Sequence, residues 1–229
     1  MMVKQERAAR TRQALIRAGA EVFAREGFVP ASLAVISRRA GVSSGALHFH
    51  FESKRALAQA VEDEAVRAVR QTVRDASDRG GGALQAVVDA TYGLMSRIDG
   101  DVVVRAGFEL CGGLVHGRGP SLRQEWQRWI EDMLQRAGRD GWLAEGVSVD
   151  DAAATIVAAT MGFEVLSGED RAWLSQERVT GLWDLLLPRL AEQHALGSVS
   201  WGQGADSGGK GDDGGSRRAG GVWLADPHT

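Results

Sequence analysis

The chain has 229 residues, of which 44% are hydrophobic and 25% are charged, proportions that are usual in globular proteins. They exclude a fibrous repeat and wholesale disorder. No stretch reaches the ~18 to 20 apolar residues of a membrane-spanning helix, and the polar, basic first residues do not lead into a signal peptide. We therefore expect a cytoplasmic protein without a membrane partner. The only cysteine, Cys111, excludes an internal disulfide and a cysteine-rich zinc site, and is expected to be a buried apolar filler.

The net charge of −3 hides an uneven distribution along the chain. Residues 1–55 hold ten Lys and Arg against four Asp and Glu, a net charge of +6, whereas the remainder holds 17 against 26, a net charge of −9. A basic segment is attracted to DNA phosphates through counterion release, and an acidic segment is repelled by them. The N-terminal quarter is therefore the part expected to meet a nucleic acid.

The first predicted elements are two helices. Hydrophobic residues at helical spacing predict a helix over residues 6–26, and Gly27 stands where a C-terminal cap is expected. Ser32 is the expected N-cap of a second, short helix that turns Ile36 inward and stops at Gly41.

A third short helix follows closely. Ser43 is expected to cap it, residues 44–51 give it about two turns, and Ser53 opens the next helix. Three helices within about fifty residues, with a glycine-containing turn between the second and third, are the helix-turn-helix layout.

The rest of the chain is also predicted to be helical, so the expected fold class is all-α. Further helices are expected over residues 54–79, 83–98, 102–115, 121–139, 148–167 and 171–193. Ser148, with Asp151 three residues later, resembles a capping box at the start of the helix over 148–167. Pro188 is expected to interrupt or kink the last of them. Beyond them, nine glycines in the 24 residues from Ser198 to Gly221 predict a disordered tail.

The segment SLAVISRRAGVSSGALHFHFESKRAL, residues 32–57, resembles the DNA-binding signature of TetR-family repressors. Ten positions agree with that signature: Ile36, Ala40, Gly41, Val42, Ser43, Gly45, His50, Phe51, Lys54 and Leu57. Three depart from it, namely Ser32 for Thr, Ser37 for Ala and His48 for Tyr. Histidine is shorter than tyrosine and changes charge near neutral pH, so the phosphate contact at His48 is expected to differ in reach and to depend on pH.

The resemblance implies a set of DNA-binding residues in this sequence. Those implied to face base edges are Ser44, Gly45, Ala46 and, at a thymine methyl group, Phe49. Those implied to hold phosphates are His48, His50 and Lys54, with Ser43 capping the helix toward the DNA backbone. Few of these side chains can form bidentate base contacts, so part of the specificity is expected to come from DNA shape.

The middle of the chain resembles the γ-butyrolactone receptor branch of the same family. The likeness rests on the segments 89–91 (DAT) and 103–107 (VVRAG) and on Pro120 followed by Trp126. It implies a homodimeric repressor of antibiotic biosynthesis genes that binds double-stranded operator DNA and is released by a small-molecule inducer, a lactone, butenolide or furan. Its two recognition helices would lie ~34 to 36 Å apart, one turn of DNA.

The resemblance also implies a ligand cavity between the middle helices. We expect it to be lined first by Trp126, Thr91 and Thr160, and then by Tyr92, Met95 and Phe163. Each of these residues is also suited to ordinary core packing, and Trp129, which shares a helix face with Trp126, is assigned to the core.

The expected domains are therefore a helix-turn-helix DNA-binding domain at 1–53, a helical ligand-binding and dimerisation domain at 54–196, and a disordered tail at 197–229. The dimer surface is expected on the last two helices, about 148–167 and 171–193, as in the family.

Two alternatives stay open at this point. One is the same repressor fold responding to an antibiotic or another late product. The other is a helical small-molecule-binding or enzymatic domain that keeps a non-functional helix-turn-helix.

Against enzymatic chemistry, we find no nucleophile and base constellation, phosphate loop or dinucleotide fingerprint. Asp150, Asp151, Glu169 and Asp170 stand at helix starts, where acidic residues suit the helix dipole. His48 and His50 point to different sides of a helix and do not predict a metal site. We expect neither a cofactor nor an enzymatic activity.

Overall fold

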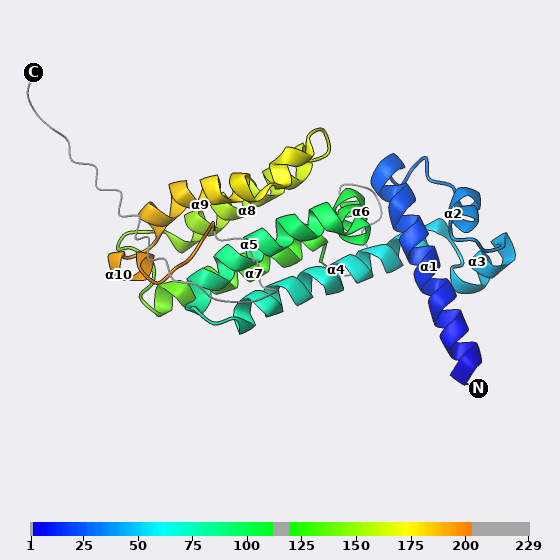
Figure 1. Ribbon diagram of the computed structural model, residues 1–229, viewed down its shortest axis with the longest axis horizontal. Helices are drawn as coiled ribbons and strands as arrows, with labels where there is room; N and C mark the ends of the chain where they lie inside the picture. Colours follow the sequence, from blue (N-terminus) through cyan, green and yellow to red (C-terminus); the bar gives the residue numbers. More distant parts are fainter. Residues whose placement is uncertain (1, 112–119, 203–229) are drawn as a thin grey trace, which may run out of the picture.

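The computed structural model describes residues 2–111 and 120–202, and the regular structure in these ranges is helical, without a strand (Figure 1). The small domain contains α1 (Met2–Glu26), α2 (Leu33–Arg39) and α3 (Ser44–His50). The larger domain contains α4 (Lys54–Asp78), α5 (Gly82–Gly100), α6 (Val102–Cys111), α7 (Leu122–Arg139), α8 (Val149–Leu166), the 3-10 helix η1 (Arg171–Leu174), α9 (Gln176–Leu190) and α10 (Gln193–Leu196). The all-α prediction is confirmed.

The core of the small domain is built from buried side chains that each of its three helices contributes. Phe23 of α1, Ile36 of α2 and Leu47 of α3 are fully buried, and Phe51 closes the core just beyond α3. Gly19 lets α1 approach α4, because a Cβ at this position would meet the side chain of Leu57 at 3.1 Å. The hydrophobic pattern therefore fixes α3 on one side and leaves its other side to solvent.

Serine side chains cap five of the helices in the described ranges. Ser43 accepts a hydrogen bond from Ala46 N, Ser53 from Ala56 N, and Ser148 from Asp151 N, so these three predicted caps are confirmed. Ser121 forms a full capping box with Gln124 at the start of α7. Ser32 is the N-cap residue of α2, as predicted, although its side chain forms no capping hydrogen bond.

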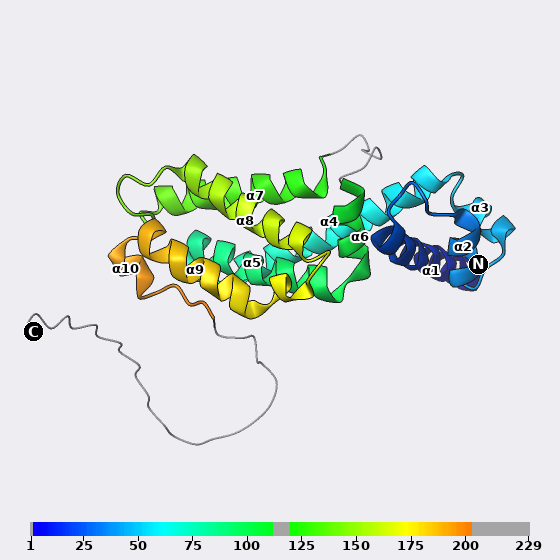
Figure 2. The ribbon, with the colours of Figure 1, turned by 90° about the horizontal axis from the view of Figure 1, so that it is seen from above.

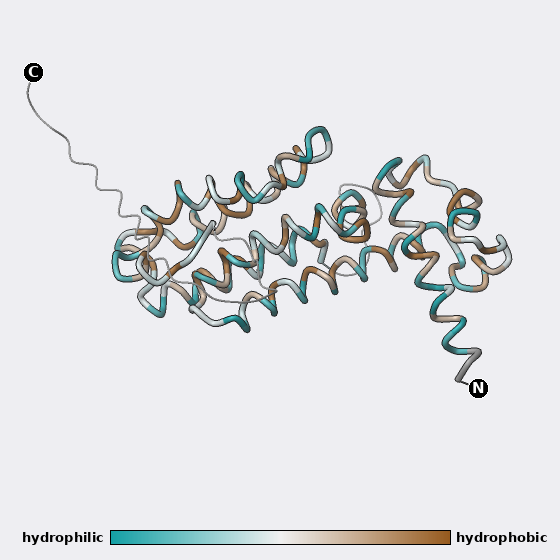
Figure 3. The backbone as a smooth tube through the Cα atoms, viewed as in Figure 1, coloured by the Kyte–Doolittle hydropathy of each residue, from teal (hydrophilic) through white to brown (hydrophobic). Residues whose placement is uncertain are grey.

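The larger domain is an elongated helical bundle that α4 joins to the small domain (Figures 1 and 2). Helix α5 runs through its middle, and eleven of its 19 residues are buried. Hydrophobic residues recur along the neighbouring helices (Figure 3) and form one continuous core with those of α5. No helix in the described ranges is both long and apolar enough to cross a membrane.

Helix α6 touches both domains, because it packs against α1 as well as α4. Gly107 makes the α4 contact possible, since a Cβ there would overlap the Cβ of Ala65. Shape changes in the larger domain can therefore reach the small domain through α6 as well as through α4.

The predicted helix boundaries need correction at the C-terminal end. The expected helix over 171–193 is divided: residues 171–174 form η1, Ser175 caps α9, and α9 ends at Leu190 with Pro188 inside its last turn. The predicted helix over 102–115 is described only as far as Cys111, so its last part lies outside the described residues.

The first residues of the predicted disordered tail are in fact bound to the bundle. The Gln85 amide pairs with the backbone of Ser200, accepting from its N–H at 2.7 Å and donating to its carbonyl at 2.9 Å. Trp201 Nε1 donates to Asp184 Oδ1 at 2.7 Å, and Val199 is buried. The expected boundary at 197 was therefore too early, and residues 203–229 lie outside the described residues.

Replacing Gly107 with Ala is expected to lower the free energy of unfolding by about 1–3 kcal/mol, because the added methyl group overfills the contact between α6 and α4. Gly100→Ala is the matched control, since no atom lies within 4 Å of a Cβ at this position. Urea unfolding at one fixed protein concentration measures both variants. Equal stability of the two would contradict the tight contact.

Candidate DNA-binding surface and ligand core

One face of α3 is free for a partner while the other is anchored. Leu47 points into the core, whereas Ser44, Gly45, His48 and Phe49 are exposed. Ala46 and His50, the remaining predicted contact residues on α3, are half-buried. The exposed side chains are thus among those that the sequence assigned to DNA.

Phe49 has no packing role that would explain an aromatic residue. Its exposed fraction is 83%, and its one ring neighbour is His50, with the ring centroids 5.3 Å apart. A large apolar side chain held in water on a basic domain suits an apolar contact with a partner, such as the methyl group of thymine.

Gly45 is open on the outside of α3. The nearest atom to a Cβ placed on it is the Ser43 hydroxyl, at 4.0 Å, and its φ is not in the left-handed region. The fold therefore does not require glycine at this position. A requirement for the smallest residue would have to come from the close approach of a partner.

Lys54 holds a loop of the small domain, a role that the sequence did not predict. Its ammonium group donates to the carbonyl oxygens of Val29 at 2.8 Å and Ala31 at 2.9 Å, and it lies 4.6 Å from the ring centroid of Phe28. The side chain thus fastens the loop between α1 and α2 to the first turn of α4. Residue spacing alone did not reveal this contact, and the phosphate contact of Lys54 stays a prediction.

Other basic side chains on the small domain were missed as contact candidates. Arg7 and Arg10 project from the exposed first turns of α1, and Arg38 is exposed on the last turn of α2. By contrast, Arg39 is paired with Glu21, and Arg12 lies over the ring of Phe51. The basic balance of residues 1–55 could have pointed to the first group, but not to which side chains are free of ion pairs.

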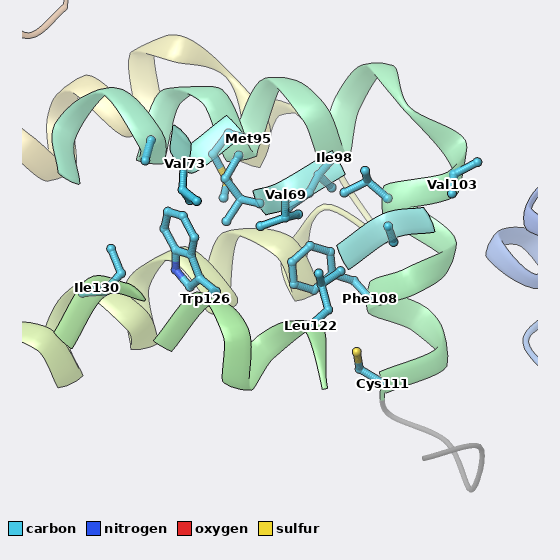
Figure 4. Close-up of a cluster of buried hydrophobic side chains, with 14 of the residues drawn as sticks. Val69, Val73, Met95, Ile98, Val103, Phe108, Cys111, Leu122, Trp126 and Ile130 are labelled. Carbon is cyan, nitrogen blue, oxygen red and sulfur yellow. The ribbon is translucent and has the colours of Figure 1, made fainter. Parts of the chain in front are cut away.

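Trp126 lies at the centre of the larger domain (Figure 4). It is fully buried, and its indole Nε1 donates to Thr160 Oγ1 at 2.9 Å, linking α7 to α8. Met95 lies near it on α5 in the same cluster (Figure 4). Thr91, one turn earlier on α5, is also fully buried and donates to the Val87 carbonyl at 2.7 Å. We call Trp126, Thr160, Thr91 and Met95 the ligand core.

Two predicted cavity residues do not join the ligand core. The Tyr92 hydroxyl lies 2.8 Å from Thr180 Oγ1 on α9 and accepts from Gly202 N, so Tyr92 serves the C-terminal attachment. The Phe163 ring packs against Trp173 of η1, with 6.0 Å between the ring centroids. Trp129 stacks on Trp126 with 5.6 Å between the centroids and remains half-buried.

A cavity of about 290 Å³ lies between α4 and α7. Its lining includes Leu122, one turn before Trp126 on α7. Glu62 lies on the cavity wall, where burial and the neighbouring Asp63 raise its pKa to about 7. Cys111 also lines the cavity, and burial raises the pKa of its thiol. The cavity wall is thus mostly polar and charged and includes a carboxyl group that is easily protonated.

Helix α8 is strongly apolar, yet only Ala153, Ile156 and Thr160 of its 18 residues are buried. Val165 and Leu166 near its end are exposed, as is Leu185 on α9. Apolar surface of this kind on two adjacent helices suits contact with a second protein chain. In the described ranges, no group of three or more His, Cys, Asp or Glu side chains is arranged to hold a metal ion.

Comparison with known proteins places these features in context. Residues 15–61 match the family model of bacterial regulatory proteins of the tetR family. The chain is 32% identical over 203 residues to the A-factor receptor protein of Streptomyces griseus. The aligned region covers 86% of this chain and 70% of that protein.

The fold of this chain is also similar to that of solved structures. A γ-butyrolactone receptor described as ArpA-like superposes with a TM-score of 0.73 at 30% identity, over 82% of this chain and 92% of that chain. A structure described as the molecular basis for control of antibiotic production by bacterial hormones gives 0.70 at 30% identity, over 80% and 98%. CprB of Streptomyces coelicolor in complex with its operator gives 0.69 at 30% identity, over 82% and 92%.

Replacing Thr160 with Val is expected to lower the free energy of unfolding by about 1–3 kcal/mol, because the buried indole N–H of Trp126 loses its acceptor. Thr155→Val on the exposed side of α8 is the control and should change stability by less than about 0.5 kcal/mol. Urea unfolding at fixed concentration gives the comparison. A neutral Thr160→Val would show that the bond carries no net stabilisation.

Proposed function

We propose a function for this chain on the premise that it belongs to the TetR family of bacterial regulatory proteins. It is a repressor that binds a near-palindromic operator as a homodimer and is released by a small signalling molecule of the γ-butyrolactone, butenolide or furan type. Its target genes are those of antibiotic biosynthesis. The relatives that support this ligand class are the A-factor receptor protein and the γ-butyrolactone receptor. The proposal assigns the chain no catalytic step and no cofactor.

The observation that carries DNA binding is the exposed face of α3, anchored by Leu47 on a basic domain. In the proposed complex, the residues at base edges are Ser44, Gly45, Ala46 and Phe49. The phosphate contacts come from His48 and His50, from the helix start capped by Ser43, and from Arg7, Arg10 and Arg38.

Two copies are needed, because one short recognition helix reads only a few base pairs. The apolar faces of α8 and α9 supply the proposed contact, in which a four-helix arrangement covers Leu166 and Leu185. Symmetry then places the two α3 helices on one side of the dimer, where they can enter successive turns of the major groove.

Ligand binding must open the ligand core, since Trp126 and Thr160 are closed to solvent and bonded to each other. A lactone carbonyl that takes the indole N–H would replace Thr160 as acceptor, so that binding exchanges one hydrogen bond for another. The cavity beside Glu62 supports a route to this site from between α4 and α7.

Release follows only if the ligand binds a bundle shape that fits DNA less well. Helix α6 is the element best placed to transmit that shape, because it contacts α1 and α4 while its Phe108 lies in the same core cluster as Trp126 (Figure 4). A small displacement of α6 would change the direction of α4, and with it the separation of the two α3 helices.

Gly45→Ala tests the DNA surface. The variant should fold at least as stably as the natural chain, since space is open around Gly45 and Ala is the better helix former. Its affinity for the operator should fall at least tenfold, because the methyl group keeps α3 from the base edges. Gel shifts at 50 and 200 mM salt measure the operator affinity of the variant and of the natural chain. The natural chain should lose about 10³-fold in affinity between the two salt concentrations.

Two outcomes would contradict this surface. One is full operator affinity of Gly45→Ala, which would move the contact away from α3. The other is a natural chain whose weak binding hardly responds to salt, which would favour a helical domain with an unused helix-turn-helix.

Trp126→Phe tests the ligand core. A smaller aromatic ring remains and the N–H is lost, so a 2-acyl-γ-butyrolactone should release the operator only at about tenfold higher concentration, the effect of one hydrogen bond. Operator affinity without the lactone should be unchanged. Trp129→Phe, on the same helix, is the matched control and should respond normally. Equal responses of the two variants would place the ligand elsewhere.

A further inference from the structure

A second hollow lies between the two domains and is separate from the ligand core. It has a volume of about 530 Å³, within the range of about 300–1,000 Å³ that is usual for small-molecule sites. One wall is the loop after α1, with Phe28, Val29 and Pro30, and the others come from α6, the start of α7 and the end of α8. We call it the interdomain groove.

Arg123 offers unused hydrogen-bond donors at this groove. Its Nη2 donates to Glu164 Oε2 at 3.0 Å, the one hydrogen bond that its side chain forms in the described ranges. Its Nε is buried without an acceptor, while 35% of the side chain remains exposed. The exposed part of this side chain lines the groove, where the guanidinium group has further N–H donors for a bound acceptor.

The groove favours a neutral molecule over an ion. The positive side chains on its walls are Arg105 and Arg123, and the negative ones are Glu109 and Glu164, so their formal charges cancel. Arg105 is already held by the carbonyl oxygens of Ile98 and Asp99, at 2.8 and 2.9 Å. A further anion would therefore meet two carboxylates without a free counter-charge.

Apolar side chains complete the groove. Phe108 and Ile98 are buried at its base, and Phe28 lies on the side of the small domain. At the rim, Val29 is 80% exposed and Val165 is 61% exposed. These two valines come from different domains, and a bound molecule would remove both from water.

We propose that the interdomain groove is a second effector site, which takes a small neutral molecule combining an apolar chain with one carbonyl group, such as a lactone, ester or amide. The carbonyl oxygen accepts from the Arg123 guanidinium, and the chain lies between Phe28 and Phe108. Because the walls come from both domains, an occupied groove favours one domain spacing over the others.

Two contacts connect this site with the rest of the molecule. Lys54 holds the same loop from its other side, through the carbonyl oxygens of Val29 and Ala31. The Arg123–Glu164 pair links α7 to α8 one turn away from the Trp126–Thr160 bond. An effect of the groove on the operator rests on the proposed function, whereas binding to the groove does not.

Methyl NMR of the full-length chain, labelled at valine, tests the site with γ-octalactone as the probe. Val29 and Val165 report on the groove and Val73, beside Trp126 (Figure 4), reports on the ligand core. The signals of Val29 and Val165 are assigned from their alanine variants. We expect both methyl signals to shift with the same saturable dependence on lactone concentration. The midpoint of that curve should be independent of any change in the Val73 signal.

Arg123→Lys is the matched variant, because it keeps a positive charge beside Glu164 and removes the guanidinium donors. The midpoint at Val29 and Val165 should rise about tenfold, while the response at Val73 stays the same. Val29→Asp, which alters only an exposed side chain, should give a comparable loss at Val165 by an independent route.

Three results would overturn the proposal: no saturable shift at Val29 and Val165, an unchanged midpoint in Arg123→Lys, or octanoate acting at lower concentration than the lactone. Gel shifts on the same samples keep the two proposals apart. Failure to bind the operator would remove the proposed function and leave the groove result standing.

Discussion

The contact of α6 with α4 is the constraint on which the rest of the arrangement depends. Gly107 presses its backbone against Ala65, so α6 cannot move along α4 without carrying the long helix with it. The other side of α6 packs on α1, which belongs to the domain with the basic surface. A hydrophobic bundle and a DNA-binding domain thereby share one helix, and the state of one cannot change independently of the other.

The bundle itself is closed by two polar links between α7 and α8, spaced one turn apart. The Trp126–Thr160 bond is fully buried, and the Arg123–Glu164 pair lies at the edge of the interdomain groove. A buried donor and acceptor hold each other because water cannot replace either partner. In the proposed function, a ligand that opens the core would have to supply an equivalent acceptor, and a small compound with a carbonyl group would meet that requirement.

Local signals in the sequence predicted the helices well, and contacts between distant residues explain what they missed. Ser43, Ser53 and Ser148 cap helices as expected because a cap needs only the next three residues. Helical spacing placed Thr91 and Tyr92 together, but adjacent residues point to different neighbours, and Tyr92 meets α9. In the same way, neither the hold of Lys54 on the loop 28–31 nor that of Gln85 on Ser200 leaves a periodic pattern.

The composition of α3 limits how such a protein can recognise DNA. Its exposed face carries Ser44, Gly45, His48 and Phe49, and none of these forms the two parallel hydrogen bonds by which Arg reads guanine or Asn reads adenine. Phe49 can distinguish a thymine methyl group, and the small residues allow close approach rather than readout. The remaining selectivity must come from how readily a sequence adopts the groove width and bend that bring both helices of a dimer into contact. A bundle that sets the distance between two such helices then controls specificity as well as affinity, because the distance decides which DNA shapes fit.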